Sequence, residues 1–346
     1  MKLASFARFV APSAALMLLL MALPLAMTFY LSVRNCALQM EMVTVSESTP
    51  FGTREVTTQR AVLGPDGRAL TTCRFVGLDY FRTVLGLGSG ASAASAAAPP
   101  EASGAGAVPD NAAQARQQRS TEFIGALRFT LLYTFATTPF VLLIGFVLAL
   151  AVHHVSRRWQ GPYISATLLP FIITPVVGAL AIKWLFRDNG FVPYLLSQFG
   201  ISMFWMAQAW SAQLLIILYG IWHVVPFAFI VLYAGLQSVP QDSLEAARID
   251  GASAWQRLIY VTIPHLAPLF VFVTLIHLMD AYRVFEPVVV LTQGAFTTSV
   301  QVLTYYTLLD EQNPYKASAA AVLTTAGIAV LLLPLLIKTW KEHRRG

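Results

Sequence analysis

The sequence predicts an all-α membrane protein with six transmembrane helices. Of its 346 residues, 56% are hydrophobic and only 12% are charged, about half the charged fraction of a typical soluble domain. Apolar runs long enough to cross a bilayer, about 20 residues each, recur along the whole chain. They are residues 9–33, 123–152, 162–186, 211–237, 267–291 and 316–338.

The basic residues predict the orientation of these spans. A net charge of +6 can indicate nucleic-acid binding, but the Lys and Arg residues lie in short loops and at both ends rather than in one stripe, so we expect no nucleic-acid partner. If the N-terminus lies inside, the two short outer loops hold only Arg187 and Lys316, whereas the inner segments hold ten basic residues. The long first outer loop is left out of this comparison, because long loops cross largely regardless of charge. Both ends are therefore expected to be cytoplasmic, with residues 339–346 as a basic tail.

The first apolar run raises the alternative of a cleaved signal peptide. Residues 9–33 are about twice as long as the apolar core of a usual signal. We therefore expect residues 1–33 to remain as a cytoplasmic N-terminus and first membrane helix.

Residues 34–122 are expected to form an external loop with two parts. Residues 53–76 alternate β-forming side chains around Gly64-Pro65-Asp66-Gly67, which predicts a β-hairpin. Residues 87–120 consist mainly of Ala, Gly, Ser and Pro and have little to bury, so we expect a flexible linker. Its role is not indicated by the sequence.

The two cysteines of the chain, Cys36 and Cys73, both fall in this external segment. The outer compartment of a bacterial cell is oxidising, so our hypothesis is a disulfide that ties the hairpin to the top of the first span. Closing such a loop stabilises a fold by roughly 3–4 kcal/mol. Two unpaired thiols are the alternative.

Residues 123–338 form the predicted five-helix core. Pro170 and Pro175 interrupt the third apolar run of the chain, 162–186, and Pro226 and Pro334 lie in the fourth and the sixth. In a bilayer, backbone groups freed by proline need a partner or a water-filled cavity. The prolines therefore indicate either a pathway through the core or kinks that serve packing alone.

A polar segment, residues 239–268, separates the fourth and fifth apolar runs. Asp242 followed by Glu245 is a helix-capping signal, and Gly251 can take the left-handed conformation that ends a short helix. The segment is expected to face the cytoplasm.

A second capping box follows at Ser253 and Gln256, and Pro264 and Pro268 are expected to direct the chain into the fifth span. Two short helices joined at a glycine would make a rigid projection, slim enough to enter a cleft of another protein. The pattern is typical of a docking segment.

The same residues resemble a known family. Glu245-Ala246-Ala247, Gly251 and Val261-Thr262-Ile263-Pro264 match the EAA motif, spaced EAA-x3-G-x9-I-x-L-P, with Val and Ile in place of the usual Ile and Leu. That motif marks permease subunits of binding-protein-dependent ABC importers. The longer form with Asp250-Gly251-Ala252 is similar to the carbohydrate branch, which includes the maltose and glycerol-phosphate permeases.

The resemblance extends over 76–85, 168–186 and 282–296, and departs from the branch at Gly294-Ala295-Phe296. It implies the type I (MetI-like) ABC importer permease fold, with residues 239–268 as a coupling loop that sits in a groove of an ATPase subunit. The residues that it assigns to coupling are Glu245, Ala246, Ala247, Asp250, Gly251 and Pro264.

ATP chemistry is expected in a partner, so the chain itself is not expected to be an enzyme. No lysine follows a glycine, which excludes a phosphate loop of the G-x-x-x-x-G-K-[ST] type. The resemblance implies no cofactor in this chain, ATP-Mg in a pair of ATPase subunits, a second permease subunit, an external solute-binding protein and a bacterial inner-membrane location. The long external segment favours a heterodimer of permeases, and a homodimer stays open.

The resemblance also implies a midplane cavity between the spans that flank the coupling loop. Aromatic faces would pack on a sugar ring, while Asp280 and the histidines would bond to its hydroxyls. The residues placed on this path are Gly220, His223, Val224, Phe227, His277, Asp280 and Ala281.

Simpler interpretations of these polar residues remain. Arg283 can pair with Asp280 or Glu286, and a histidine in a span can serve only as a hydrogen bond between helices. Spaced in threes, His277, Asp280, Arg283 and Glu286 are not expected to face one cavity together. His153 and His154 are expected at an interface, and no Cys/His/carboxylate cluster has the spacing of a metal site.

Two other classes of function compete. An ion-driven secondary carrier would use Asp280 as a proton site, and an integral membrane enzyme would use His277 and Asp280. Neither accounts for the double-capped docking segment. The sequence does not identify which carbohydrate an importer would carry.

Overall fold

The computed structural model describes residues 3–49, 52–63, 70–87, 109–200 and 204–344. These residues form two compact units: one contains Met1–Phe123 and Thr304–Leu323, and the other contains Ile124–Leu303 and Thr324–Gly346. Five helices in the described part are long and apolar enough to cross a membrane, and a bent helix pair makes a sixth candidate. The predicted class, an all-α membrane protein with a small β element, is confirmed.

The first unit begins with α1 (Leu3–Ser32), which covers the first predicted span. Its side chains from Leu16 to Leu25 are largely exposed, as expected for a helix that faces lipid. The helix runs through Pro12 and Pro24.

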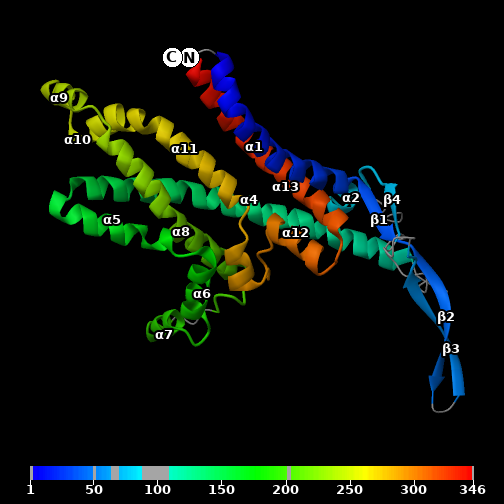
Figure 1. The fold of residues 1–346 in the computed structure, drawn as a ribbon. Helices are drawn as coiled ribbons and strands as arrows, with labels where there is room; N and C mark the ends of the chain where they lie inside the picture. The colour runs from blue at the N-terminus through cyan, green and yellow to red at the C-terminus, as the bar shows by residue number, and fades with distance from the viewer. Residues whose placement is uncertain (1–2, 50–51, 64–69, 88–108, 201–203, 345–346) are drawn as a thin grey trace. The chain divides into compact units, whose positions relative to one another are not determined.

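Two antiparallel strand pairs follow α1 (Figure 1). Strand β1 (Arg34–Leu38) pairs with β4 (Thr71–Phe75), and β2 (Met40–Thr49) pairs with β3 (Gly52–Ala61). The predicted hairpin around Gly64–Gly67 is therefore wrong in its pairing, and residues 64–69 lie outside the described residues. The segment Met40–Thr49 also alternates β-forming residues, and its ten-residue ladder with β3 offers more backbone hydrogen bonds than the five-residue β4 can.

A disulfide joins Cys36 of β1 to Cys73 of β4, as hypothesised from the sequence. The two residues lie directly opposite each other in the strand register, with their Cα atoms 4.0 Å apart. The hydroxyl of Tyr315, near the start of α13 (Pro314–His343), donates a hydrogen bond to the carbonyl of Cys36 at 2.8 Å. The ring of Tyr315 stacks on Tyr80 of α2 (Asp79–Val84). The cross-linked strands are thus attached to two helices of the same unit.

Cysteine labelling tests this cross-link. We expect no maleimide labelling of the unreduced protein and two labels after reduction, because both sulfurs are consumed in one bond. The measurement is the mass of the intact protein after labelling under denaturing conditions. Two labels without reductant would show that the thiols are free.

The second unit is built around α4 (Pro109–His154), α8 (Ala209–Gln237) and α11 (Ile263–Ala281). One core cluster joins Phe146 of α4, Phe229 and Leu232 of α8, and Leu266 of α11. A Cβ atom added at Gly145 would lie 2.7 Å from the Cβ of Ala228, so the glycine permits close contact between α4 and α8.

Helix α4 begins well before the second predicted span. Its start at Pro109 makes residues 109–120 helical, so the predicted linker is wrong over that part, and residues 88–108 lie outside the described residues. The reason is composition: AAQAR is rich in strong helix formers, and proline suits the first helical position.

The third predicted span, 162–186, is broken. Helices α5 (Arg157–Ile172) and α6 (Pro175–Phe186) are separated by two extended residues, and the pair formed by α5 and the stretch Pro175–Gln198 is bent by 92°. That stretch includes α7 (Phe191–Gln198). Thr174 has φ −59° and ψ 142° because the proline ring that follows disfavours the helical conformation. Pro170 and Pro226, by contrast, lie inside continuous helices.

The fifth predicted span, 267–291, is shifted towards the N-terminus. The helical stretch runs from α10 (Ala254–Arg257) through η2 (Leu258–Thr262) into α11 and ends at Ala281. In η2 the N–H of Ile263 bonds to the carbonyl of Leu258, five residues back. Pro264 has no N–H group and cannot donate the next helical hydrogen bond, so a widened π turn just before it is compatible with the proline. The remaining elements are η3 (Val288–Thr292) and α12 (Val300–Leu309).

Candidate functional site

The polar segment between α8 and α11 contains one separate short helix, α9 (Gln241–Ile249). It ends in a Schellman motif: Ala252 donates its N–H to the carbonyl of Ala247 at 2.9 Å, and Gly251 donates to that of Arg248 at 3.0 Å. Gly251 has φ +79°, a conformation that costs other L-residues roughly 1–2 kcal/mol. The sequence prediction for this glycine is confirmed.

The predicted N-terminal cap of α9 is wrong. Pro240 is the N-cap residue, α9 starts at Gln241, and no side chain caps it. Asp242 therefore lies inside the helix, and its carboxylate does not accept the backbone N–H hydrogen bond that an N-cap side chain accepts. Its charge still lies in the first turn, where it interacts favourably with the helix dipole.

The second capping box is confirmed. The Ser253 hydroxyl accepts from the N–H of Gln256 at 3.3 Å, and the Gln256 side chain accepts from the N–H of Ser253 at 2.7 Å. The helix that it opens is not a separate short helix, because α10 continues through η2 into α11. Pro264 and Pro268 accordingly lie within the helical stretch rather than at a re-entry turn.

The residues predicted for coupling lie on the surface of this segment. Ala247 is half-buried and the other five are exposed, namely Glu245, Ala246, Asp250, Gly251 and Pro264. Large apolar side chains lie beside them: Ile249 is 87% exposed and Trp255 is 68% exposed. Such exposure next to charged residues is typical of an interaction surface.

A cavity of about 140 Å³ lies between α4, α8 and α11. Except for Phe227, all the residues predicted for the solute path line it: Gly220, His223, Val224, His277, Asp280 and Ala281. Phe227 instead stacks on Phe171 of α5, with ring centroids 6.1 Å apart. It lies one helical turn beyond His223, where α5 packs on α8.

Tyr133 of α4 and Tyr219 of α8 also line this cavity and were not predicted. Tyr219 precedes His223 by four residues, so the shared helix face could have indicated it. No sequence signal marks Tyr133, because its position depends on how α4 packs on α8. A Cβ atom at Gly220 would collide with the Tyr133 hydroxyl, so this glycine admits the tyrosine.

Two of these side chains satisfy the backbone where the third span is broken. Nδ1 of His223 donates to the carbonyl of Pro170 at 2.9 Å, and the Tyr219 hydroxyl donates to that of Pro175 at 2.7 Å. The two rings stack, with centroids 5.7 Å apart. Carbonyls near a helix break within a membrane need such partners, so His223 and Tyr219 hold the broken span against α8.

His277 connects α11 to α4. Its Nε2 lies 3.0 Å from Oγ1 of Thr137, and the Thr137 hydroxyl lies 2.8 Å from the carbonyl of Tyr133, to which it donates. The imidazole therefore donates through Nε2, which makes Nδ1 an acceptor. Nδ1 is buried and has no hydrogen-bond partner among the described residues. The predicted alternative, an interhelical hydrogen bond, accounts for one nitrogen only.

The charged residues after His277 do reach one cavity, contrary to expectation. Asp280, Arg283 and Glu286 all line it, because α11 ends at Ala281 and the following turn brings the later residues back. Arg283 and Asp280 approach to 3.7 Å, with 52% and 68% of their side chains exposed. An ion pair that exposed adds little stability in water. Among the described residues, no group of three or more metal-ligating side chains could hold a metal ion.

Residues 122–344 match the family described as the binding-protein-dependent transport system inner membrane component. The trehalose transport system permease protein SugA of Mycobacterium tuberculosis is 33% identical over 207 residues, covering 60% of this chain and 66% of SugA. The trehalose/maltose permease MalF of Thermococcus litoralis is 31% identical over 196 residues, covering 55% of this chain and 66% of MalF. The chain thus spans just under two thirds of each relative.

Solved structures agree on the fold. A chain of a bacterial ABC transporter involved in the import of the acidic polysaccharide alginate superposes with a TM-score of 0.61 at 23% identity, covering 69% of this chain and 85% of that one. Because the family match spans more than half of the residues, the chain belongs to the inner membrane components of binding-protein-dependent transport systems.

Proposed function

We propose that this chain is the permease subunit of an ATP-driven importer of a sugar, polyol or related carbohydrate. The observation that carries the proposal is α9, a helix that ends at Gly251 and exposes Glu245, Ala246 and Ile249. The names of the relatives, which include trehalose, maltose and lactose permeases, support the substrate class.

Coupling would occur through α9. Glu245 is exposed on this helix, and a charge that becomes desolvated and hydrogen-bonded in an interface is costly to truncate, roughly 2–5 kcal/mol. One chain carries one such segment, so a pair of ATPase subunits would need two permease chains. We propose a second permease and an external solute-binding protein as the other partners, with both termini of this chain in the bacterial cytoplasm.

Solute would pass the cavity lined by Asp280, Tyr219 and His223. Its volume of about 140 Å³ is below the roughly 300–1,000 Å³ of usual ligand pockets, which fits a chain that supplies half of a pathway. The bare acceptor Nδ1 of His277 suits a hydroxyl donor, and hydroxyls are what carbohydrates provide. Because this nitrogen is buried, solute could reach it only if the surrounding helices move. Such movement is expected of a transporter that opens its pathway to one side of the membrane and then to the other.

Reconstitution tests the proposal against a secondary carrier. In proteoliposomes we expect no uptake of labelled disaccharide or polyol by this chain alone, with or without a proton gradient, because the energy would come from ATP hydrolysis in the partner subunits. Uptake is expected when the partner ATPase, the second permease and the solute-binding protein are present with ATP-Mg. Accumulation by the single chain under a proton gradient would overturn the proposal in favour of the carrier.

A further inference from the structure

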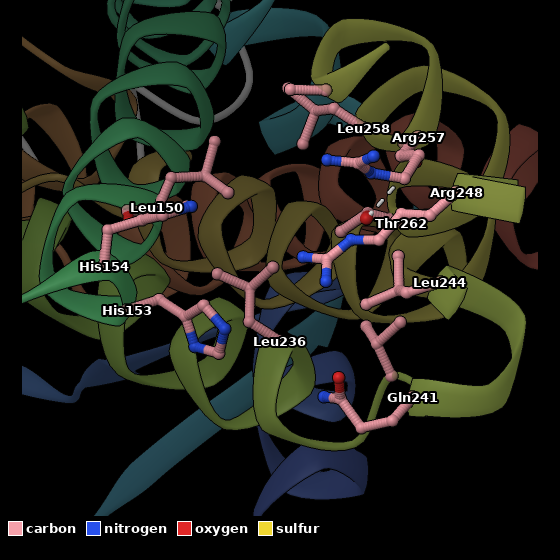
Figure 2. A pocket seen from close by; sticks show the side chains of 12 residues that line it. Leu150, His153, His154, Leu236, Gln241, Leu244, Arg248, Arg257, Leu258 and Thr262 are labelled. Carbon is pink, nitrogen blue, oxygen red and sulfur yellow. Dashed lines mark hydrogen bonds between the residues drawn. The ribbon is translucent and has the colours of Figure 1, made fainter. Parts of the chain in front are cut away.

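A second and larger cavity, of about 350 Å³, lies behind the segment that carries α9 (Figure 2). Its walls come from the last residues of α4, the end of α8, the inner side of α9, and the α10–η2 stretch. It shares no lining residue with the cavity around His277. Its volume falls within the range of usual ligand pockets, about 300–1,000 Å³.

The titratable side chains that line this cavity are all basic, and Gln241 and Thr262 add neutral polar groups. His153 and His154 of α4, Arg248 of α9 and Arg257 of α10 contribute to it, and no Asp or Glu is among the lining residues. Figure 2 shows the two guanidinium groups and the His153 imidazole around one space. A cluster of this sign, without a carboxylate, is suited to an anion.

The donors of this cluster are largely available. Arg257 donates through Nη1 to the carbonyl of Ala252 at 3.1 Å, which leaves further N–H groups of its guanidinium for another partner. Arg248 belongs to none of the ion pairs found within the described part of the chain. Nδ1 of His154 donates to the carbonyl of Leu150 at 2.7 Å, so Nε2 remains.

The apolar lining selects an amphiphile over a free ion. Four leucines line the same space: Leu150, Leu236, Leu244 and Leu258. A small anion such as inorganic phosphate would leave these side chains without contacts. A phosphate that carries acyl chains would use the arginines and the leucines together, since the chains supply the apolar surface that the leucines contact.

The location suits a lipid. Helix α4 ends at His154 and α8 ends at Gln237, and both pass the length and hydropathy criteria of membrane spans. The cavity lies at these helix ends, where a span of this length would leave the hydrocarbon core, and basic pockets between span ends are known to take anionic headgroups.

We propose that this cavity binds the phosphate of an anionic phospholipid, held by Arg248 and Arg257. The bound headgroup would connect α9 to the ends of α4 and α8 and so stiffen the segment from behind. The proposal depends on the membrane location of the chain and not on the proposed transport function.

Lipid binding to the purified full-length chain is the test, measured by native mass spectrometry as phosphatidylglycerol, phosphatidylcholine or inorganic phosphate is added. We expect wild type to retain phosphatidylglycerol in preference to phosphatidylcholine. The R248Q/R257Q double variant should bind it at least about tenfold more weakly. The control is R157Q/R158Q, which removes two arginines at the start of α5 that do not line the cavity and is expected to bind as wild type does.

Two further variants separate binding from folding. R248K keeps the charge and should retain most of the affinity, while L244W, which fills the cavity from the apolar side, should lose it with both arginines intact. Equal loss in R157Q/R158Q and R248Q/R257Q would show only a general charge effect and overturn the proposal. Unchanged binding in the latter would overturn it as well. Displacement of the lipid by inorganic phosphate at equal concentration would identify a free-anion site instead.

Discussion

Replacing Gly251 with proline is expected to reduce ATP-driven uptake by at least about tenfold while the chain still inserts into the membrane. Proline holds φ near −65°, whereas Gly251 has φ +79° and donates its N–H to Arg248. The variant therefore loses the Schellman motif and redirects α9, but α8 and α11 keep their own core contacts. Uptake and ATPase stimulation in the reconstituted complex measure the effect.

Asparagine at the same position is the matched control. It tolerates the left-handed conformation and keeps the N–H donor, so Gly251→Asn should retain most of the uptake. Glu245→Ala should lower uptake with α9 intact, because it removes only an exposed side chain. Wild-type coupling in Gly251→Pro would show that the direction of α9 is irrelevant to transport.

Filling the cavity at Gly220 should have an effect of similar size. Leucine at this position would collide with the Tyr133 hydroxyl and occupy space between α4 and α8. Overpacking of this kind costs about 1–3 kcal/mol, which lowers the melting temperature, and the blocked path should abolish solute uptake. Uptake assays and thermal melting in detergent measure the two consequences separately.

Gly125→Leu on α4 provides the control for this change, since a Cβ atom there meets nothing within 4 Å. It adds the same side chain to a helix of the same unit and should leave both uptake and melting close to wild type. Normal uptake by Gly220→Leu, with a lowered melting temperature, would place the solute path elsewhere.

The glycine end of α9 and the second capping box were predicted correctly because their signals are local. Ser253 and Gln256 are three residues apart, and a capping box needs only those two side chains and their own backbone. Gly251 was identified for a similar reason, since a left-handed helix end depends on the residue itself. The error at Asp242 arose because the N-cap position falls two residues earlier, at Pro240, which has no side chain that can accept a hydrogen bond, so the usual preference for a polar N-cap residue did not identify it.

The strands and the broken span show where local signals were insufficient. A turn sequence at Gly64–Gly67 and a run of β-formers predicted a hairpin, but the choice of partner depends on competition with Met40–Thr49 elsewhere in the chain. Pro175 predicted an interruption, but not a bend of 92°. That bend is compatible with the membrane because His223 and Tyr219 donate hydrogen bonds to the carbonyls of Pro170 and Pro175 beside the break.

By itself, the sequence determined the class of the protein, most of its apolar spans, the glycine end of α9 and six residues that line the cavity around His277, because hydropathy, capping and motif spacing act over a few neighbouring residues. Only the tertiary structure decided that Tyr133 meets Gly220, that Arg283 and Glu286 return to the same cavity as Asp280, and that Arg248 and Arg257 share a pocket with His153. Those contacts arise where separate helices pack against each other or end. The residue pattern of one helix predicts neither its packing partners nor the turn after Ala281.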